Sequence, residues 1–320
     1  MAVYTHISRT ELEDFLKAYD LGTLVSFAGI PQGVSNTNYK IVTDQGPYIL
    51  TLFESRVKDS DLPFFFDFMA HLNDKDISCP YALPDTAGQY FNKIAGRTAV
   101  IINFLPGRSL ERADLTSHHC AELGAFVARM HLAAADFDKT RVNGVSLPTW
   151  EDLAAKTKDK ADTIYSGLAR IVADEIEYLA AHWPAETDLP RAAVHADIFP
   201  DNVFFDDAQT ISGIIDFYFS CTDFLLYDLA LVINAWCFDG NHEFAADKYQ
   251  SFMQAYTALR PLTVAETDRI SFMGRAAALR ILMTRSFAYL NRNPDDLVFS
   301  LDPLEYIAKL RFHQSADHDR

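Results

Sequence analysis

Residues 192–217 read Ala-Ala-Val-His195-Ala-Asp197-Ile-Phe-Pro-Asp201-Asn202-Val-Phe-Phe-Asp-Asp-Ala-Gln-Thr-Ile-Ser-Gly-Ile-Ile-Asp216-Phe217. Two short apolar runs, each typical of a buried strand, frame this stretch. Asp197 and Asn202 flank the loop after the first run, and Asp216 ends the second. A carboxylate can accept a proton, and carboxylate and amide oxygens are hard ligands that suit Mg²⁺. The stretch therefore predicts a site at which a general base and a metal ion lie together.

The spacing of these polar residues resembles that of protein kinases. His-x-Asp-x4-Asn matches their catalytic loop, and Asp-Phe at the end of the next strand matches their metal-binding segment. The two fragments in this order, separated by one hairpin, indicate phosphoryl transfer. Asp197 is then the base that accepts the proton of the attacking hydroxyl, and Asn202 and Asp216 hold Mg²⁺. His195 is grouped with the catalytic residues because it supports the loop by hydrogen bonding, and Asp201 either faces the substrate or caps the turn.

Two hydrolytic interpretations of the same residues fit less well. A Ser-His-Asp hydrolase needs a Gly-x-Ser-x-Gly elbow, which the chain lacks. A metallohydrolase needs further histidines nearby, and the next one along the chain is His242. The remaining alternative for a loop rich in Asp and Asn is a plain turn, which the paired kinase-like fragments disfavour.

Composition limits the class of protein. The chain has 320 residues and a formal net charge of −16, which argues against nucleic acid or an anionic membrane as a partner. It contains no apolar run of about 18 residues and no basic, apolar leader, so a cytoplasmic location is expected. The four cysteines are scattered without paired spacing, so neither a disulfide framework nor a zinc site is expected: Cys79, Cys120, Cys221 and Cys237.

The first third of the chain predicts a small β-rich lobe. A capping box at Thr10–Glu13 starts a helix that extends to residue 20, and a second helix is expected over residues 59–74. Strand-like runs are expected at residues 24–27, 39–43, 48–53, about 81–83 and 98–104, with a polar turn over 92–97.

Two segments of this lobe are candidates for nucleotide binding. The loop over residues 29–38 is rich in glycine and small polar side chains, which lets backbone N–H groups approach phosphate oxygens. Its candidates are Gly33, Ser35, Asn36 and Thr37, although a plain hairpin turn would look the same. Asn103 and Leu105 precede a break at Pro106-Gly107, where exposed backbone could pair with an adenine edge.

The rest of the chain is expected to be mainly helical. Helices are predicted over residues 116–134, 150–157, 162–183, 223–236, 242–259, 265–290 and 303–312. His131, near the end of the first of these, is expected to pack or to interact with the helix C-terminus. The prediction is an α+β, bilobal, protein-kinase-like fold, with a nucleotide-binding lobe over residues 1–103 and a helical lobe over 104–320 that carries one β-hairpin and the acceptor site.

Over nearly its whole length the chain resembles the aminoglycoside phosphotransferase and choline kinase group. His195 to Val203 is similar to that group's catalytic loop, Ile214 to Phe217 to its metal-binding strand, and Asp223 to Asp228 to the helix start that follows. In this group the position of Asp228 braces the catalytic loop. The sequence between these motifs is most similar to that of the bacterial homoserine kinases of the phosphotransferase type. The resemblance implies transfer of the γ-phosphate of ATP to the hydroxyl of L-homoserine, a step in threonine synthesis.

One position departs from the kinase pattern. Kinases place on the third strand a Lys that grips the α- and β-phosphates, and here Thr51 stands at that position. Lys40, Arg56 or Lys58 could replace it, or backbone N–H groups and Mg²⁺ could hold the triphosphate. Thr51 also leaves open a non-catalytic nucleotide-binding module of kinase fold.

The acceptor is expected to be a small molecule with a hydroxyl group. Homoserine would need an Arg fork for its carboxylate and an acidic partner for its ammonium group. The candidates are Tyr218, Asp223 and Arg280, the last chosen from Arg275, Arg280 and Arg285, which recur every five residues. Choline, an aminoglycoside or methylthioribose remain alternative acceptors.

Overall fold

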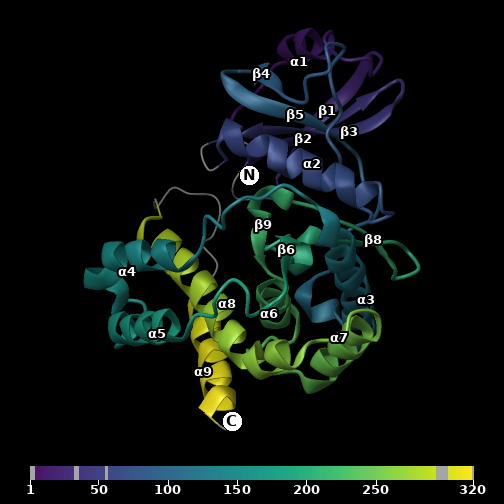
Figure 1. Cartoon of the computed structure of the whole chain (residues 1–320). Helices are drawn as coiled ribbons and strands as arrows, with labels where there is room; N and C mark the ends of the chain where they lie inside the picture. Colours follow the sequence, from purple (N-terminus) through teal and green to yellow (C-terminus); the bar gives the residue numbers. More distant parts are fainter. Residues whose placement is uncertain (1–3, 32–35, 55–56, 293–301, 319–320) are drawn as a thin grey trace. The chain divides into compact units, whose positions relative to one another are not determined.

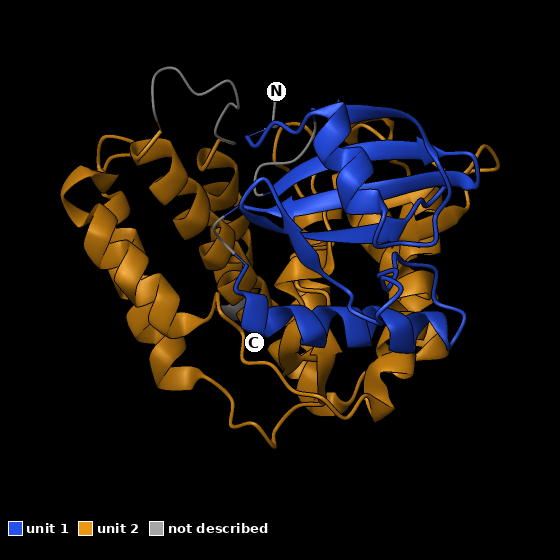
Figure 2. Cartoon of the chain, turned by 90° about the horizontal axis from the view of Figure 1, so that it is seen from above, with its two compact units in different colours: residues 1–106, 295–298 blue, residues 107–294, 299–320 orange. Residues whose placement is uncertain are grey.

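The computed structural model describes residues 4–31, 36–54, 57–292 and 302–318. The chain divides into two compact units, one that runs to Pro106 and one that begins at Gly107 (Figure 2). We call them the N-terminal unit and the C-terminal unit. The predicted boundary between residues 103 and 104 falls at the end of β5 (Arg97–Asn103), three residues before the division between the two units.

The N-terminal unit is built on one five-stranded antiparallel sheet (Figure 1). Its strand order is β1-β2-β3-β5-β4, so β3 is central, and it pairs with β2 and β5. The strands are β1 (Leu24–Ile30), β2 (Asn36–Thr43), β3 (Gly46–Phe53), β4 (Asn92–Ile94) and β5 (Arg97–Asn103).

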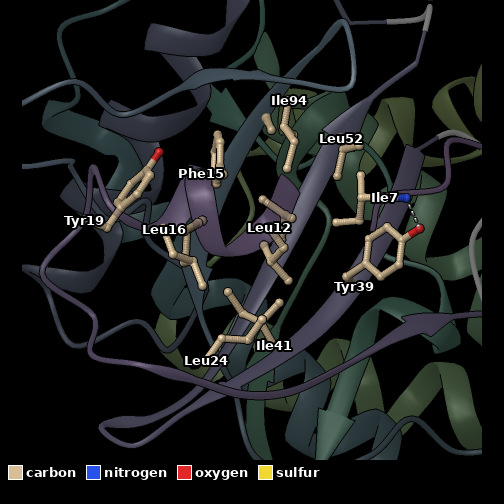
Figure 3. Packing of buried hydrophobic residues seen from close by; sticks show 13 residues of the cluster. Ile7, Leu12, Phe15, Leu16, Tyr19, Leu24, Tyr39, Ile41, Leu52 and Ile94 are labelled. Carbon is tan, nitrogen blue, oxygen red and sulfur yellow. Dashed lines mark hydrogen bonds between the residues drawn. The ribbon is translucent and has the colours of Figure 1, made fainter. Parts of the chain in front are cut away.

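Helix α1 (Arg9–Leu16) covers one face of this sheet. Its spacing places Leu12, Phe15 and Leu16 on one side, and they pack with Leu50 and Leu52 of β3 in a single apolar cluster (Figure 3). The capping box begins two residues earlier than the sequence suggested. Ser8 caps the helix and Glu11 binds back to the Ser8 backbone N–H at 2.8 Å, because the motif Ser-x-x-Glu also fits here.

Two details of the N-terminal unit differ from the prediction. Residues 81–83 are not a strand, because Ala82 makes only an isolated bridge to Ile102. Residues 92–97 are not simply a turn, because Asn92–Ile94 pairs with β5 and only Ala95 and Gly96 reverse the chain, both with positive φ. The predicted second helix is present as η1 (Asp59–Asp61) followed by α2 (Leu62–Asn73).

The C-terminal unit is mainly helical, as predicted. Its helices are α3 (Ser117–Ala133), α4 (Leu147–Ala161), α5 (Leu168–His182), α6 (Leu225–Trp236), α7 (Ala246–Leu259), α8 (Val264–Leu290) and α9 (Leu304–His318). Short turns of 3-10 helix connect them: η2 (Arg112–Asp114), η3 (Ala134–Asp136), η4 (Pro200–Asn202) and η5 (Phe217–Phe219). All residues of α6 are buried, so this helix is the centre of the unit. None of the helices in the described ranges is long and apolar enough to cross a membrane.

This unit holds two small sheets where the sequence predicted one hairpin. β6 (Arg191–Val194) pairs with β9 (Cys221–Phe224), and β7 (Val203–Phe205) pairs with β8 (Ile211–Ile214). The second pair is the predicted hairpin. The first pair is formed by residues far apart in the sequence, which local periodicity does not reveal.

Helices α3 and α7 approach closely at Gly124. A Cβ atom at this position would lie 2.2 Å from the backbone oxygen of Phe252, so α7 would have to move. We expect Gly124→Ala to destabilise the protein by about 1–3 kcal/mol, the usual cost of overpacking. Thermal unfolding would measure this, with Gly144→Ala as control, because the nearest atom to a Cβ there is 3.9 Å away. Equal midpoints for the two variants would contradict the close packing.

Candidate active site

The loop between β6 and β7 contains the predicted catalytic residues. His195 and Ala196 are buried, and Asp197 retains 17% of its side-chain exposure. Ala196 has a φ of +61° and Asp216, after β8, a φ of +67°. Side chains other than glycine rarely adopt this left-handed region, and such strain concentrates at functional sites. The two strained residues therefore mark this loop and the end of β8 as a candidate site.

Asp228, in the first turn of α6, fixes the start of the loop. Its two carboxylate oxygens accept the backbone N–H groups of His195 at 3.2 Å and of Ala196 at 2.8 Å. His131 Nε2 lies 3.2 Å from the same carboxylate. Burial alone would raise the pKa of Asp228, but the hydrogen bond from His131 and the other contacts of the carboxylate, including the Ala196 backbone N–H, outweigh burial and lower it. The buried carboxylate is thus stabilised in its charged form and holds Ala196 in its strained conformation.

A buried polar chain continues from Asp228 towards α7 and α8. His131 Nδ1 lies 2.8 Å from the Tyr256 hydroxyl, which accepts a hydrogen bond from Arg260 at 2.9 Å. Arg260 in turn pairs with Glu266 at 2.7 Å. Because the carboxylate of Asp228 can only accept, Nε2 of His131 carries the proton and Nδ1 accepts from Tyr256. The sequence suggested a packing role for His131 but not this connection to the loop.

His195 has the contacts of a positioning residue. Its Nδ1 accepts the backbone N–H of Asp197 at 3.1 Å, and its Nε2 lies 3.0 Å from the carbonyl oxygen of Ile215. Since that carbonyl can only accept, Nε2 carries the proton. Burial lowers the pKa of His195 to about 4, so the ring is neutral near pH 7. His195 therefore ties the catalytic loop to the residue that precedes Asp216.

Asn202 connects the two predicted functions of the site. Its Nδ2 donates to the backbone oxygen of Asp197 at 2.8 Å and lies 3.3 Å from the Asp197 carboxylate. Its backbone oxygen accepts the N–H of Ile215 at 2.9 Å, which sets Asp216 one residue further on. Its Oδ1 accepts no hydrogen bond from any described residue. An amide oxygen without a partner and a carboxylate on a fixed backbone are a donor set that fits Mg²⁺.

Arg280 of α8 contacts the loop between β6 and β7. It is buried, its Nη1 donates to the backbone oxygen of Ala196 at 2.5 Å, and its Nη2 is 3.7 Å from Asp197 Oδ1. The guanidinium also lies over the ring of Phe219, 5.4 Å from its centroid. Arg280 was predicted to bind substrate, and the structure places it against the backbone and the carboxylate of the loop.

The other predicted acceptor residues are distributed around the loop. Asp201 is exposed in η4, and Tyr218 is half-buried in η5. Asp223 is buried in β9, where its carboxylate accepts from Asn143 Nδ2 and from the Phe224 backbone N–H, each at 2.7 Å. Burial outweighs these bonds and raises the pKa of Asp223.

The predicted nucleotide residues lie in the N-terminal unit, apart from Gly33 and Ser35, which fall outside the described residues. Thr37 is fully buried, and its hydroxyl accepts from the backbone of Tyr4 and Thr5 and donates to Glu54 at 2.7 Å. The Thr37 hydroxyl therefore connects the N-terminal segment to the sheet. Asn36 is buried, and its Oδ1 has no hydrogen-bond partner among residues that the structure describes.

Asn103 is the last residue of β5, and Leu105 lies two residues beyond it. Asn103 Oδ1 accepts the backbone N–H of Tyr81 at 2.7 Å, and Leu105 is half-buried. These contacts fix the segment that leaves β5.

Thr51 takes part in the sheet and does not carry a charge. It is buried and donates to Asn38 Oδ1 at 2.8 Å. Lys40 lies on the same face, opposite Ile49, and its ammonium group is 4.4 Å from the centroid of the Phe104 ring. Lys58 is exposed, and Arg56 falls outside the described ranges. Lys40 is thus the cation that the sheet itself presents near Thr51.

A family model described as "Phosphotransferase enzyme family" matches residues 26–262. The chain belongs to this family. Among curated relatives of this phosphotransferase, the homoserine kinase of Bradyrhizobium sp. (strain ORS 278) is 46% identical, over 100% of this chain and 98% of its own length. The homoserine kinase of Xanthobacter autotrophicus (strain ATCC BAA-1158 / Py2) is 48% identical, over 99% of this chain and 97% of its own.

Solved structures agree with the fold. An amicoumacin kinase in complex with AMP-PNP and Ca²⁺ matches with a TM-score of 0.69 and 16% identity, over 98% of this chain and 94% of its own. The choline kinase of Cryptosporidium parvum Iowa II matches with a TM-score of 0.67 and 14% identity, over 98% and 96%. The predicted resemblance, the α+β kinase-like fold and the assignment to small-molecule kinases are therefore confirmed.

Proposed function

We propose that this phosphotransferase is a homoserine kinase, which transfers the γ-phosphate of ATP to the hydroxyl of L-homoserine. One geometric observation carries the reaction class. Asn202 is bonded both to Asp197 and, through Ile215, to the backbone that presents Asp216. The proposed base and the two oxygens proposed to hold a metal are thus tied together by hydrogen bonds. Full-length similarity to homoserine kinases supports the acceptor.

In the proposed mechanism Asp197 accepts the proton of the homoserine hydroxyl. The hydroxyl oxygen forms a bond to the γ-phosphorus as the bond to the leaving oxygen of ADP breaks, which yields O-phosphohomoserine, ADP and a proton on Asp197. Asn202 and Asp216 would hold Mg²⁺, which supplies charge neutralisation at the β- and γ-phosphates when bound. Arg280, whose Nη2 lies 3.7 Å from Asp197 Oδ1, orients the carboxylate.

We further propose that residues 1–103 bind the nucleotide and residues 104–320 the acceptor. Asn36, with its unpartnered buried oxygen, and the fixed backbone at Asn103 and Leu105 are the described candidates for ATP contacts. Lys40 is the described cation best placed to take the part of the missing third-strand Lys, because it lies on the face of Thr51.

The acceptor can be tested with the purified protein, ATP and Mg²⁺. We expect Mg²⁺-dependent ADP release with L-homoserine, and little with choline, an aminoglycoside or methylthioribose. Removal of Mg²⁺ by a chelator should abolish turnover, and added Mg²⁺ should restore it, because the Asp216 carboxylate and the triphosphate are both negative and need a cation between them. Phosphorylation of choline but not of homoserine would overturn the acceptor. Nucleotide binding without turnover on any acceptor would support a non-catalytic module instead.

A further inference from the structure

A charged cluster that the proposed mechanism does not use lies between α8, α9 and η2. We call it the Glu305 cluster, and it consists of Glu305, Arg112, Arg285 and Lys309. Arg285 Nη1 pairs with one Glu305 oxygen at 2.7 Å, and Arg112 Nη1 pairs with the other at 2.5 Å. Lys309 also binds that second oxygen. Figure 1 shows α8 and α9, the two helices that supply most of the cluster, side by side in the C-terminal unit.

The cluster has more positive than negative charge. Within the described ranges, Arg112, Arg285 and Lys309 form ion pairs with Glu305 and with no other carboxylate. The Lys309 side chain is fully enclosed, while the Arg285 and Arg112 side chains are 9% and 31% exposed. Buried charge is costly unless it is paired. Three cations around one carboxylate therefore leave a place where a second anion would be stabilised.

The pKa values of the cluster agree with this imbalance. Burial would raise the pKa of Glu305, but the three cations outweigh burial and lower it to about 2. Burial lowers the pKa of Lys309 to about 8, although it is bonded to Glu305. The single carboxylate has three positive neighbours, whereas the three cations share one negative neighbour.

Tyr306 lies beneath two cations of the cluster and is near enough to Asp197 to be influenced by its charge. Arg285 and Lys309 lie over its ring, 4.6 Å and 4.4 Å from the centroid. Tyr306 is fully buried, and its hydroxyl has no hydrogen-bond partner among the residues described. Burial raises the pKa of Tyr306, and the negative charge of Asp197 adds to this rise. The proposed base is thus within electrostatic reach of the same tyrosine that the cations cover.

We propose that Arg285 and Arg112 bind the carboxylate of the acceptor amino acid, with the Tyr306 hydroxyl as an additional donor. Arg285 donates through Nη1 to the backbone oxygen of Asp302 and to Glu305, and its Nε and Nη2 have no partner in the described part of the chain. That edge of a guanidinium matches a carboxylate in a bidentate manner. Lys309 is enclosed and holds Glu305 in place. This inference rests on the proposed function, because it assigns one end of the proposed acceptor.

The experiment compares L-homoserine with homoserinol, its analogue in which a hydroxymethyl group replaces the carboxylate. The variant Arg285→Met leaves Arg112 and Lys309 to compensate Glu305, and Arg112→Met alters a more exposed position. We expect each variant to raise KM for homoserine by about 10-fold or more, because a charge-assisted pair lost in binding costs about a factor of ten. The same variants should change kcat/KM for homoserinol, which has no carboxylate, by less than about 3-fold. KM for ATP should stay unchanged. Arg269→Met, on the same helix, is the matched control for loss of one positive charge.

The outcomes are distinguishable from failure of the proposed function. If the unaltered enzyme does not phosphorylate homoserine, the acceptor itself is wrong. If it does, and Arg285→Met and Arg112→Met lower turnover of homoserine and homoserinol equally, the cluster is structural and the inference is overturned. A rise in KM for ATP alone would assign the cluster to the nucleotide and overturn it as well. Tyr306→Phe, which removes one oxygen, keeps the test decisive should an Arg variant fail to fold, with a raised KM for homoserine expected.

Discussion

Asp197→Asn should lower kcat for homoserine phosphorylation by about 10²–10⁴-fold, the usual contribution of a positioned general base. The substitution preserves the size of the side chain and removes its negative charge and its ability to take a proton. Asn202 and Arg280 would still hold the loop, because their main contacts are to the backbone oxygens of Asp197 and Ala196. ATP affinity should therefore change little.

Steady-state kinetics with calorimetric measurement of ATP binding would check this expectation. Asp207→Asn is a suitable control, because Asp207 is exposed in the turn between β7 and β8 and makes no ion pair with a described residue. Turnover of Asp197→Asn within about tenfold of the unaltered enzyme would exclude Asp197 as the base.

Asp228→Ala should affect both stability and activity. It would leave the N–H groups of His195 and Ala196 and the ring of His131 without their shared acceptor in a fully buried place. Removing one partner of a buried charged network costs about 3–5 kcal/mol. Ala196 would also lose the bond that holds it at positive φ, so the loop would relax and turnover should fall even in the folded fraction.

Denaturant unfolding at fixed pH would measure the loss of stability, and kcat at a temperature where the variant is folded would measure the loss of activity. Asp268→Ala, at an exposed position of α8, should be close to neutral in both. Asp228→Asn keeps one acceptor oxygen and should retain an intermediate stability. Unchanged kcat in a folded Asp228→Ala protein would show that the loop holds its geometry without the brace.

Much of the fold was predictable because it depends on local periodicity. The stripe of Leu12, Phe15 and Leu16 and the apolar run over residues 48–53 of β3 are both visible in the sequence. The β6–β9 pair was not predictable, because its two strands are separated by the whole catalytic hairpin. The capping box was misplaced by two residues because two overlapping motifs satisfy the same pattern.

The candidate site was predictable in its residue types but less so in its supports. Asp197, Asn202 and Asp216 follow from motif spacing, whereas nothing about an alanine indicates that Ala196 is left-handed. Arg275, Arg280 and Arg285 recur every five residues, and the sequence could not assign them. In the structure each is buried against a different partner: Glu175, the Ala196 carbonyl and Glu305. Such roles depend on tertiary packing, which spacing along one helix does not encode.

The attachment of the catalytic loop to Asp228 has a consequence for how the enzyme loses activity. Loops that open independently have exposed hydrogen bonds and few buried contacts. The backbone N–H groups of His195 and Ala196 are instead bonded to a fully buried carboxylate of α6, the helix at the centre of the C-terminal unit. The loop therefore belongs to the same cooperative unit as that core. Inactivation by heat or denaturant should follow unfolding of the unit itself, so turnover serves as a direct report of its folded fraction.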